Sequence, residues 1–216
     1  MNSEVNALLF INGTAPGKLP KLEGYNIVAC TDGAFHYVKD LGLDPNRLTF
    51  ISGDFDSHTP DDSILYSEKY IPTPDQNFTD FYKALEILHL QGATHVDVYG
   101  GSGGEMDHFL GNIHVAHQFK HRLELVFYDK FAKYFFLPNS SVIMTTPGQL
   151  VSLYPYPIAR QVITKGLKWS LKGDTLDITR RIGTRNVAVA DEIEINYSEG
   201  DLLLFIGRLD QSNDSL

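Results

Sequence analysis

The sequence Val96-Asp97-Val98-Tyr99-Gly100-Gly101-Ser102-Gly103-Gly104 joins a largely apolar run to a glycine-rich loop. A helical pattern follows it, because Met106, Phe109, Leu110 and Ile113 recur at spacings of three and four. A strand, a tight turn and an amphipathic helix in this order are typical of a parallel α/β sheet.

The glycine-rich loop itself permits two interpretations. Its glycines would let the backbone approach a phosphate group closely, and the helix N-terminus would attract the phosphate charge. A plain connection between a strand and a helix would also explain the glycines. The loop matches neither the Walker A motif nor the Gly-x-Gly-x-x-Gly pattern of dinucleotide-binding folds.

Strand-like and helix-like segments alternate over the first two thirds of the chain, so we expect a parallel α/β domain over residues 1–137. Helical patterns cover residues 34–41 and 78–90 and begin again at Met106. The apolar runs that predict strands are Ala7–Ile11, Ile27–Cys30, Leu48–Ile51, Val96–Tyr99 and Leu123–Phe127.

The pattern changes after Leu137. Short alternating runs follow one another, separated by Pro, Gly, Asn and Asp, and Glu192–Tyr197 alternates strictly between polar and apolar residues. No helical pattern of useful length occurs there. We expect a second domain over residues 138–216, an all-β sandwich or barrel.

Composition and charge exclude several classes of protein. The 216 residues are 43% hydrophobic and 12% aromatic, which is a globular composition. With 18 Lys and Arg against 27 Asp and Glu, the net charge is −9, so we expect no nucleic-acid partner and no membrane partner. A cytoplasmic location is expected, because neither a spanning apolar run nor a signal peptide is visible. The single cysteine, Cys30, is expected to be a buried, reduced thiol.

Six acidic residues directly follow predicted strands or begin predicted helices. In an open parallel sheet these positions meet at the carboxyl edge, where ligands bind. The six residues are Asp32, Asp54, Asp56, Asp75, Asp80 and Asp107.

Each acidic motif has a structural explanation beside the functional one. Asp54 and Asp56 lie two residues apart, on one side of an extended chain, where they would hold Mg²⁺ or simply belong to a turn. Asp75 and Asp80 stand at a helix start, where acids also complement the helix dipole. The histidines of the next helix have neither a carboxylate nor a third ligand beside them at zinc-like spacing, and we interpret them as its solvated face. They are His108, His114, His117 and His121.

Taken in order, these motifs resemble the thiamine pyrophosphokinase family. The resemblance spans roughly residues 27 to 206. The matching motifs are Asp32–Ala34, Gly53–Ser57, Pro74–Asp80, Gly100–His108, Gly166–Leu171 and Gly183–Asn186.

The resemblance implies a fold and a reaction. The fold is a Rossmann-like, parallel-sheet domain over residues 1–137 that binds ATP and Mg²⁺, followed by a thiamine-binding β-sandwich over residues 138–216. The reaction transfers the diphosphate group of ATP to the hydroxyethyl group of thiamine and gives thiamine diphosphate and AMP. The family usually forms homodimers with active sites between the subunits.

The resemblance also implies roles for single residues. Catalysis and Mg²⁺ binding would fall to Asp54, Asp56, Asp80 and Asp107. The ATP site would be lined by Asp32, Asp75, Gln76, Thr79, Gly101, Gly103 and Gly104. Thiamine would stack on Trp169, which is otherwise a core tryptophan, and Thr184 and Asn186 would bind thiamine or shape its pocket.

Two positions depart from the family pattern. Glu105 stands where the family usually has Arg or Lys, and Arg185 stands where it usually has Ser. These changes are compatible with charge compensation, an altered substrate or weakened activity. Three other functions stay open: diphosphate transfer to another hydroxymethyl heterocycle such as a pterin, metal-dependent phosphohydrolysis by the Asp54 and Asp56 pair, and nucleotide sensing without catalysis, which Glu105 alone suggests.

Overall fold

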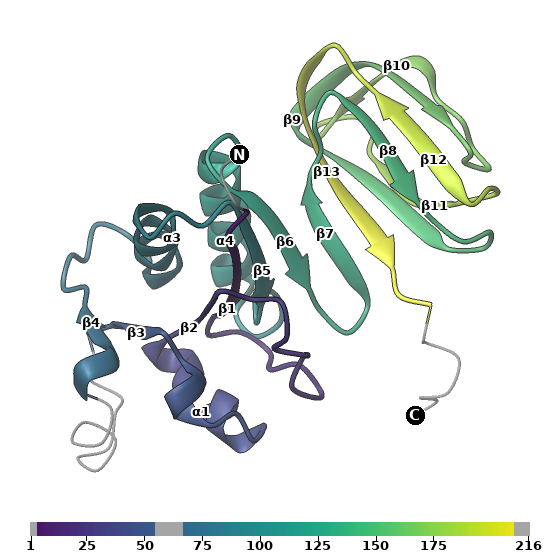
Figure 1. Cartoon of the computed structure of the whole chain (residues 1–216). Helices are drawn as coiled ribbons and strands as arrows, with labels where there is room; N and C mark the ends of the chain where they lie inside the picture. The colour runs from purple at the N-terminus through teal and green to yellow at the C-terminus, as the bar shows by residue number, and fades with distance from the viewer. Residues whose placement is uncertain (1–3, 55–66, 210–216) are drawn as a thin grey trace. The chain divides into compact units, whose positions relative to one another are not determined.

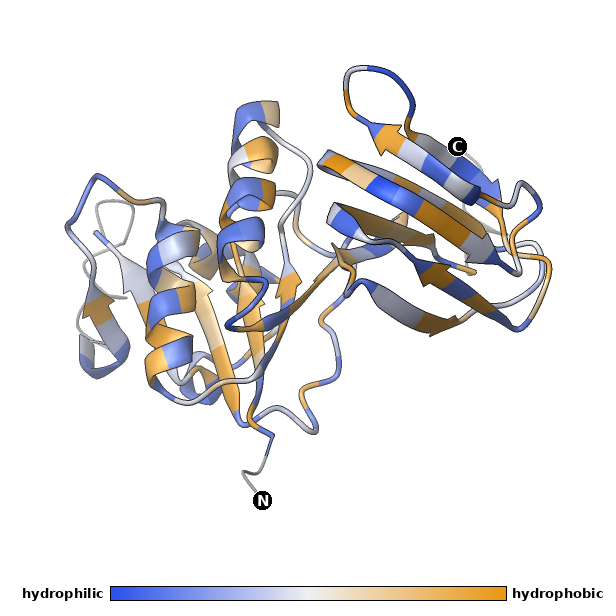
Figure 2. Ribbon diagram, turned by 90° about the horizontal axis from the view of Figure 1, so that it is seen from above, coloured by the Kyte–Doolittle hydropathy of each residue, from blue (hydrophilic) through white to orange (hydrophobic). Residues whose placement is uncertain are grey.

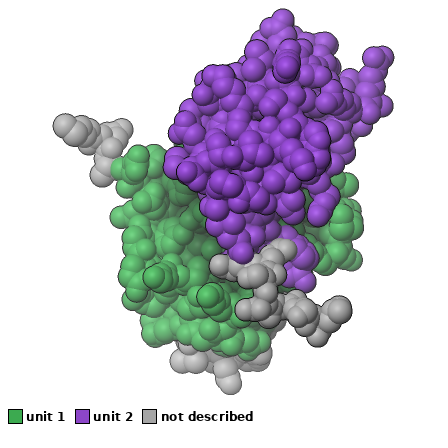
Figure 3. Space-filling model, turned by 90° about the vertical axis from the view of Figure 1, so that its right-hand side faces the viewer, with its two compact units in different colours: residues 1–129 green, residues 130–216 purple. Residues whose placement is uncertain are grey.

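The computed structural model describes residues 4–54 and 67–209. The chain divides into two compact units, Met1–Asp129 and Lys130–Leu216, coloured separately in Figure 3. The division falls before Leu137, the boundary expected from the sequence, because strand β7 (Ala132–Phe136) pairs with β13 (Glu199–Gly207) of the second unit.

The first unit is built on a parallel sheet with the strand order β4-β3-β2-β1-β5-β6. Each neighbouring pair of these strands is parallel, as the alternating pattern predicted (Figure 1). Hydrophobic residues, orange in Figure 2, dominate the central strands. The strands are β1 Asn6–Phe10, β2 Ile27–Thr31, β3 Phe50–Gly53, β4 Tyr70–Pro72, β5 His95–Tyr99 and β6 Glu124–Tyr128.

Three α-helices of the first unit each follow a strand. α1 follows β2, α3 follows β4, and α4 follows β5 (Figure 1). α3 begins at Asp80 rather than at Phe78, because the hydroxyl of Thr79 accepts a hydrogen bond from the N–H of Tyr82 at 3.2 Å and so caps the helix. The helices are α1 Asp32–Asp40, α3 Asp80–Leu90 and α4 Met106–Phe119, with short 3₁₀ turns at Pro45–Arg47 and Ser67–Lys69.

The helices cover both faces of the sheet. On one face Phe10 of β1 packs with Phe35 of α1 in a cluster that also buries Cys30, as the sequence predicted. On the other face Phe81 of α3 meets Phe127 of β6 edge to face, with ring centroids 5.7 Å apart. Because helices cover both faces of the sheet, a ligand is expected at its carboxyl edge, where strands end and helices begin.

The second unit is antiparallel, with the strand order β7-β13-β9-β12-β8 and with β10 and β11 also paired to the long strand β9. Ile193 and Ile195 alternate into its core from β12, and no helix occurs among residues 130–209. Within the described parts of the chain, no helix combines the length and apolarity needed to cross a membrane. The remaining strands are β8 Ser140–Met144, β9 Leu150–Lys165, β10 Lys172–Asp177, β11 Gly183–Val187 and β12 Glu192–Asn196.

Candidate functional site

A pocket of about 350 Å³ lies at the carboxyl edge of the first unit's sheet. Three of the six expected carboxylates line it: Asp32 at the start of α1, Asp80 at the start of α3 and Asp107 in the first turn of α4. Thr79 lines it as well, as expected. Residues from three separate helix starts therefore converge, as a parallel sheet requires.

The pocket is acidic and polar. No lysine or arginine stands among the described residues that line it. Thr31, at the end of β2, contributes to the lining, and its buried hydroxyl finds no hydrogen-bond partner among the described residues. A buried hydroxyl of this kind is usually satisfied by ordered water or a ligand.

Asp32 is the most buried of the three carboxylates. Its Oδ1 accepts a hydrogen bond from the N–H of Gly33 at 2.7 Å, at the N-terminus of α1. The side chain of Asn12, which follows β1, lies so close to Gly33 that a Cβ there would overlap it. Asn12 also lines the pocket and was not predicted from the sequence.

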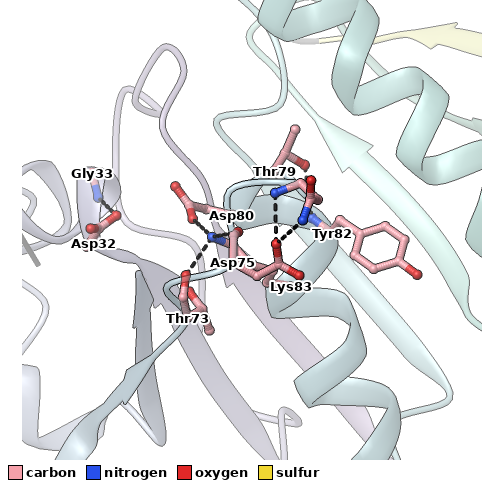
Figure 4. A network of polar contacts seen from close by, with 9 residues as sticks. Asp32, Gly33, Thr73, Asp75, Thr79, Asp80, Tyr82 and Lys83 are labelled. Atoms are coloured by element: carbon pink, nitrogen blue, oxygen red, sulfur yellow. Dashed lines mark hydrogen bonds and ion pairs between the residues drawn. The ribbon is translucent and has the colours of Figure 1, made fainter. Parts of the chain in front are cut away.

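Lys83 is a second residue that the sequence analysis missed. Its Nζ lies 2.7 Å from Oδ1 of Asp80, one helical turn earlier on α3. It also donates hydrogen bonds to the carbonyl oxygens of Thr73 at 2.7 Å and Asp75 at 3.2 Å. Figure 4 shows this ammonium group between the start of α3 and the preceding loop. The spacing of three between Asp80 and Lys83 was the available signal.

Other expected residues do not line this pocket. Asp75 accepts hydrogen bonds at Oδ1 from the backbone and the side chain of Asn77, at 2.9 and 2.8 Å, and so forms a turn. Gln76 is exposed next to it, and Asp54 is exposed at the end of β3. Asp56 lies outside the described residues.

The glycine-rich loop packs against the loop that follows β1. A Cβ on Gly103 would overlap the hydroxyl of Thr14, so close packing between the two loops requires a glycine there. The side chain of Asn112 in α4 donates to the carbonyl oxygen of Gly101 at 3.1 Å. A Cβ on Gly104 would meet no atom within 4 Å, but the φ of 68° at this residue favours glycine. Part of the loop is therefore explained by packing alone.

The first turn of α4 carries a group of possible metal ligands. The ligand atoms of Glu105, Asp107 and His108 all lie within 4.8 Å of one another, and all three residues are exposed. His108 Nε2 stands 3.5 Å from a carboxylate oxygen of Glu105. The interpretation that no carboxylate stands beside these histidines is thus wrong for His108. His114 and His121 are exposed, as a solvated face predicts, whereas His117 is half-buried.

In the second unit, Trp169 is 56% exposed, so the alternative of a core tryptophan is wrong. The side chain of Asn186 accepts a hydrogen bond from the N–H of Trp169 at 3.1 Å and donates one to its carbonyl oxygen at 2.8 Å. The ammonium group of Lys168 lies 4.9 Å from the centre of the indole ring. Thr184 is exposed on β11, and Arg185 has a φ of 56°. Asn186 therefore holds the backbone of an exposed tryptophan.

A larger hollow, of about 540 Å³, lies at the opposite, amino edge of the first unit's sheet. The buried residue Asp97 is among those that line it. The carboxylate of Asp97 accepts a short hydrogen bond from the hydroxyl of Tyr25 and pairs with Nε2 of His95 at 2.9 Å. The hydrogen bond to Asp97 raises the pKa of His95. Both oxygens of this carboxylate have hydrogen-bond partners within the protein, so Asp97 needs no ligand to satisfy its hydrogen bonds.

The fold and the carboxyl-edge pocket define an α/β protein whose candidate ligand site lies where parallel strands end and helices begin. Family models agree with this architecture. "Thiamin pyrophosphokinase, catalytic domain" matches residues 21–127, and "Thiamin pyrophosphokinase, vitamin B1 binding domain" matches residues 140–202. The chain belongs to the thiamin pyrophosphokinase family.

Known proteins show the same likeness over nearly the whole chain. Thiamine pyrophosphokinase 3 of Oryza sativa subsp. japonica is 26% identical over 227 residues, covering 91% of this chain and 85% of the rice protein. The thiamin pyrophosphokinase structure from Geobacillus thermodenitrificans superposes with a TM-score of 0.80 at 19% identity, covering 96% of this chain and 99% of that chain. The Candida albicans thiamin pyrophosphokinase superposes with a TM-score of 0.82 at 17% identity, covering 94% and 89%.

Proposed function

We propose that this protein transfers the diphosphate group of ATP to the hydroxyl of thiamine and releases thiamine diphosphate and AMP. One observation carries the proposal: Asp32, Asp80 and Asp107 converge in one pocket of the unit that matches the family's catalytic domain. The first unit is then a Rossmann-like domain that binds ATP. The second unit is the β-sandwich that binds thiamine, with Trp169 as its stacking surface.

The donor set of the pocket suits Mg²⁺, which prefers carboxylate oxygens together with substrate phosphates. The described residues that line the pocket include carboxylates but no lysine or arginine. Such a pocket would repel the negative charge of ATP that carries no metal ion. Bound Mg²⁺ would neutralise the phosphate charge and orient the reacting groups. By the family resemblance, the residues that would hold it are Asp80 and Asp107 of the pocket, together with Asp54, which is exposed after β3, and Asp56, which lies outside the described residues.

The chain's own part in the reaction is to position groups and to accept a proton. The hydroxyl oxygen of thiamine attacks the β-phosphorus, and the bond from that phosphorus to the α–β bridging oxygen breaks. AMP leaves with the electron pair of this bond. Such transfers depend chiefly on alignment and charge stabilisation. The hydroxyl proton passes to a carboxylate, for which Asp80 and Asp107 are the candidates in the pocket.

The surroundings of Trp169 favour thiamine over a pterin as the acceptor. A pterin needs several hydrogen-bonding groups, whereas the amide of Asn186 is engaged with the backbone of Trp169. An exposed indole offers a large π face, which suits a cationic heteroaromatic ring. Because Lys168 lies over one face of the indole, we assign thiamine to the other face.

We further propose that the protein acts in the cytoplasm as a homodimer with active sites between the subunits. An AMP-release assay with ATP and thiamine, with and without Mg²⁺, tests the proposed reaction. Release of AMP that requires both thiamine and Mg²⁺ is expected. Release of inorganic phosphate without an acceptor would support a phosphohydrolase instead, and tight ATP binding without turnover would support a nucleotide sensor.

A further inference from the structure

The ammonium group of Lys83 is largely withdrawn from water beside the candidate site. Only 11% of its side chain is exposed, whereas 47% of the Asp80 side chain is. A buried charge is costly unless it is paired and hydrogen-bonded. Lys83 meets this condition with the carboxylate of Asp80 and two carbonyl oxygens, those of Thr73 and Asp75.

The position of Lys83 connects two parts of the site. Asp80 begins α3 and lines the pocket, while Thr73 and Asp75 belong to the loop that leads from β4 to α3. One ammonium group therefore holds both the carboxylate and the loop before it (Figure 4).

We infer that Lys83 is a positioning residue that serves as the built-in counter-ion of Asp80 and thereby sets the affinity of the site for a divalent cation. The inference rests on the proposed function, because that proposal assigns Asp80 to the metal. An ammonium group 2.7 Å from Oδ1 of Asp80 competes with a divalent cation for this carboxylate and repels it. The same group holds Asp80 in place when no metal is bound.

Removal of the Lys83 charge should separate these two effects. In Lys83→Met the carboxylate of Asp80 is no longer neutralised, so metal binding to the nucleotide-free protein should become about three- to fivefold tighter. The loop over Thr73–Asp75 loses both of its hydrogen bonds to Lys83, so kcat should fall and the KM for MgATP should rise. Lys83→Arg keeps the charge and should stay near the wild type in metal affinity.

Lys69 provides a matched control in the same unit. Its Nζ also donates to two backbone carbonyl oxygens, those of Asn46 at 3.0 Å and Leu48 at 2.5 Å. Neither of these contacts involves a carboxylate. Lys69→Met should therefore cost comparable stability and leave both metal affinity and turnover unchanged.

The experiment is a titration of the nucleotide-free, full-length protein with Mn²⁺, followed by the electron paramagnetic resonance signal of free Mn²⁺. Tighter binding in Lys83→Met, but not in Lys83→Arg or Lys69→Met, is expected. Unchanged or weaker binding in a folded Lys83→Met protein would overturn the inference, and so would a wild type that binds no Mn²⁺. If Lys83→Met does not fold, Lys83→Gln removes the charge and keeps an amide donor, and the same tightening is expected. The titration needs no turnover, so a failure of AMP release in the wild type would count against the proposed function separately.

Discussion

The carboxylate of Asp32 lies directly against the α-carbon of Gly53, so closely that a Cβ on Gly53 would overlap it. The contact follows from the register of the sheet. Thr31 of β2 pairs with Ser52 of β3, and Asp32 and Gly53 are the residues that directly follow this pair. Asp32 is buried in this position and faces the carboxyl-edge pocket. The absence of a side chain at Gly53 therefore leaves the space that the carboxylate of Asp32 occupies in the candidate site.

Gly53→Ala should displace the Asp32 carboxylate. We expect overpacking to cost about 1–3 kcal/mol in the free energy of unfolding. AMP release should fall by about tenfold or more, because small misplacements of a site group cost up to about 100-fold. Gly17→Ala is the control, since a Cβ there meets no atom within 4 Å. Wild-type turnover in a destabilised Gly53→Ala protein would show that the contact serves packing only.

Asp80→Asn should abolish most of the activity, whereas Asp75→Asn should have a small effect. Asp80 lines the pocket, whereas the carboxylate of Asp75 accepts hydrogen bonds from Asn77 in a local turn. Loss of one electrostatic contact to a transferring group costs about 100-fold in kcat, and residual turnover in Asp80→Asn should require more Mg²⁺. Turnover measured against Mg²⁺ concentration checks this. Equal losses in the two variants would contradict the assignment of Asp80 to the metal.

Trp169→Ala should raise the KM for thiamine by about tenfold or more and leave the KM for ATP almost unchanged, because the indole offers a large exposed π face. Asn186→Ala should shift the same constant by a smaller factor, since it removes two hydrogen bonds to the backbone of Trp169 and spares the ring. Steady-state kinetics with each substrate varied in turn measure both constants. Similar increases in both KM values would argue that Trp169 is not part of a thiamine site.

The sequence was most informative where burial dictates the pattern. Buried parallel strands are largely apolar, so β1, β2 and β5 stand out in the sequence. Positions just after predicted strands or at predicted helix starts indicated that Asp32, Asp80 and Asp107 meet. β4 was missed because it has only three residues, none of them buried, and so no periodicity. Short or exposed strands are defined by their pairing partner, which a single sequence does not reveal.

The remaining gaps concern contacts between side chains and distant backbone. Lys83 bonds to carbonyl oxygens eight and ten residues away, and Asn186 to the backbone of Trp169, 17 residues away. A carbonyl oxygen belongs to every residue, so such contacts leave no mark in residue type or spacing. At Asp75 the residue types were visible in the sequence but had two interpretations. An acidic residue two positions before an asparagine is typical of a hydrogen-bonded turn, which is what Asp75 forms with Asn77, and it is equally compatible with a ligand-binding role.

The pairing of His95 with Asp97 should make stability depend on pH. The hydrogen bond to Asp97 raises the pKa of His95 above its ordinary value of 6.5, and Glu124 adds to the effect from 3.7 Å. A raised pKa in the folded state means that the stabilisation is fully present below about pH 6.5 and is lost as the pH rises through the folded-state pKa of His95. Urea unfolding between about pH 6 and about pH 9 should therefore show a falling free energy of unfolding in the wild type and a flatter profile in His95→Gln. His121→Gln, which removes an exposed histidine outside the Asp97 cluster, controls for loss of an imidazole as such. A His95→Gln profile parallel to that of the wild type would assign the pH dependence to other groups.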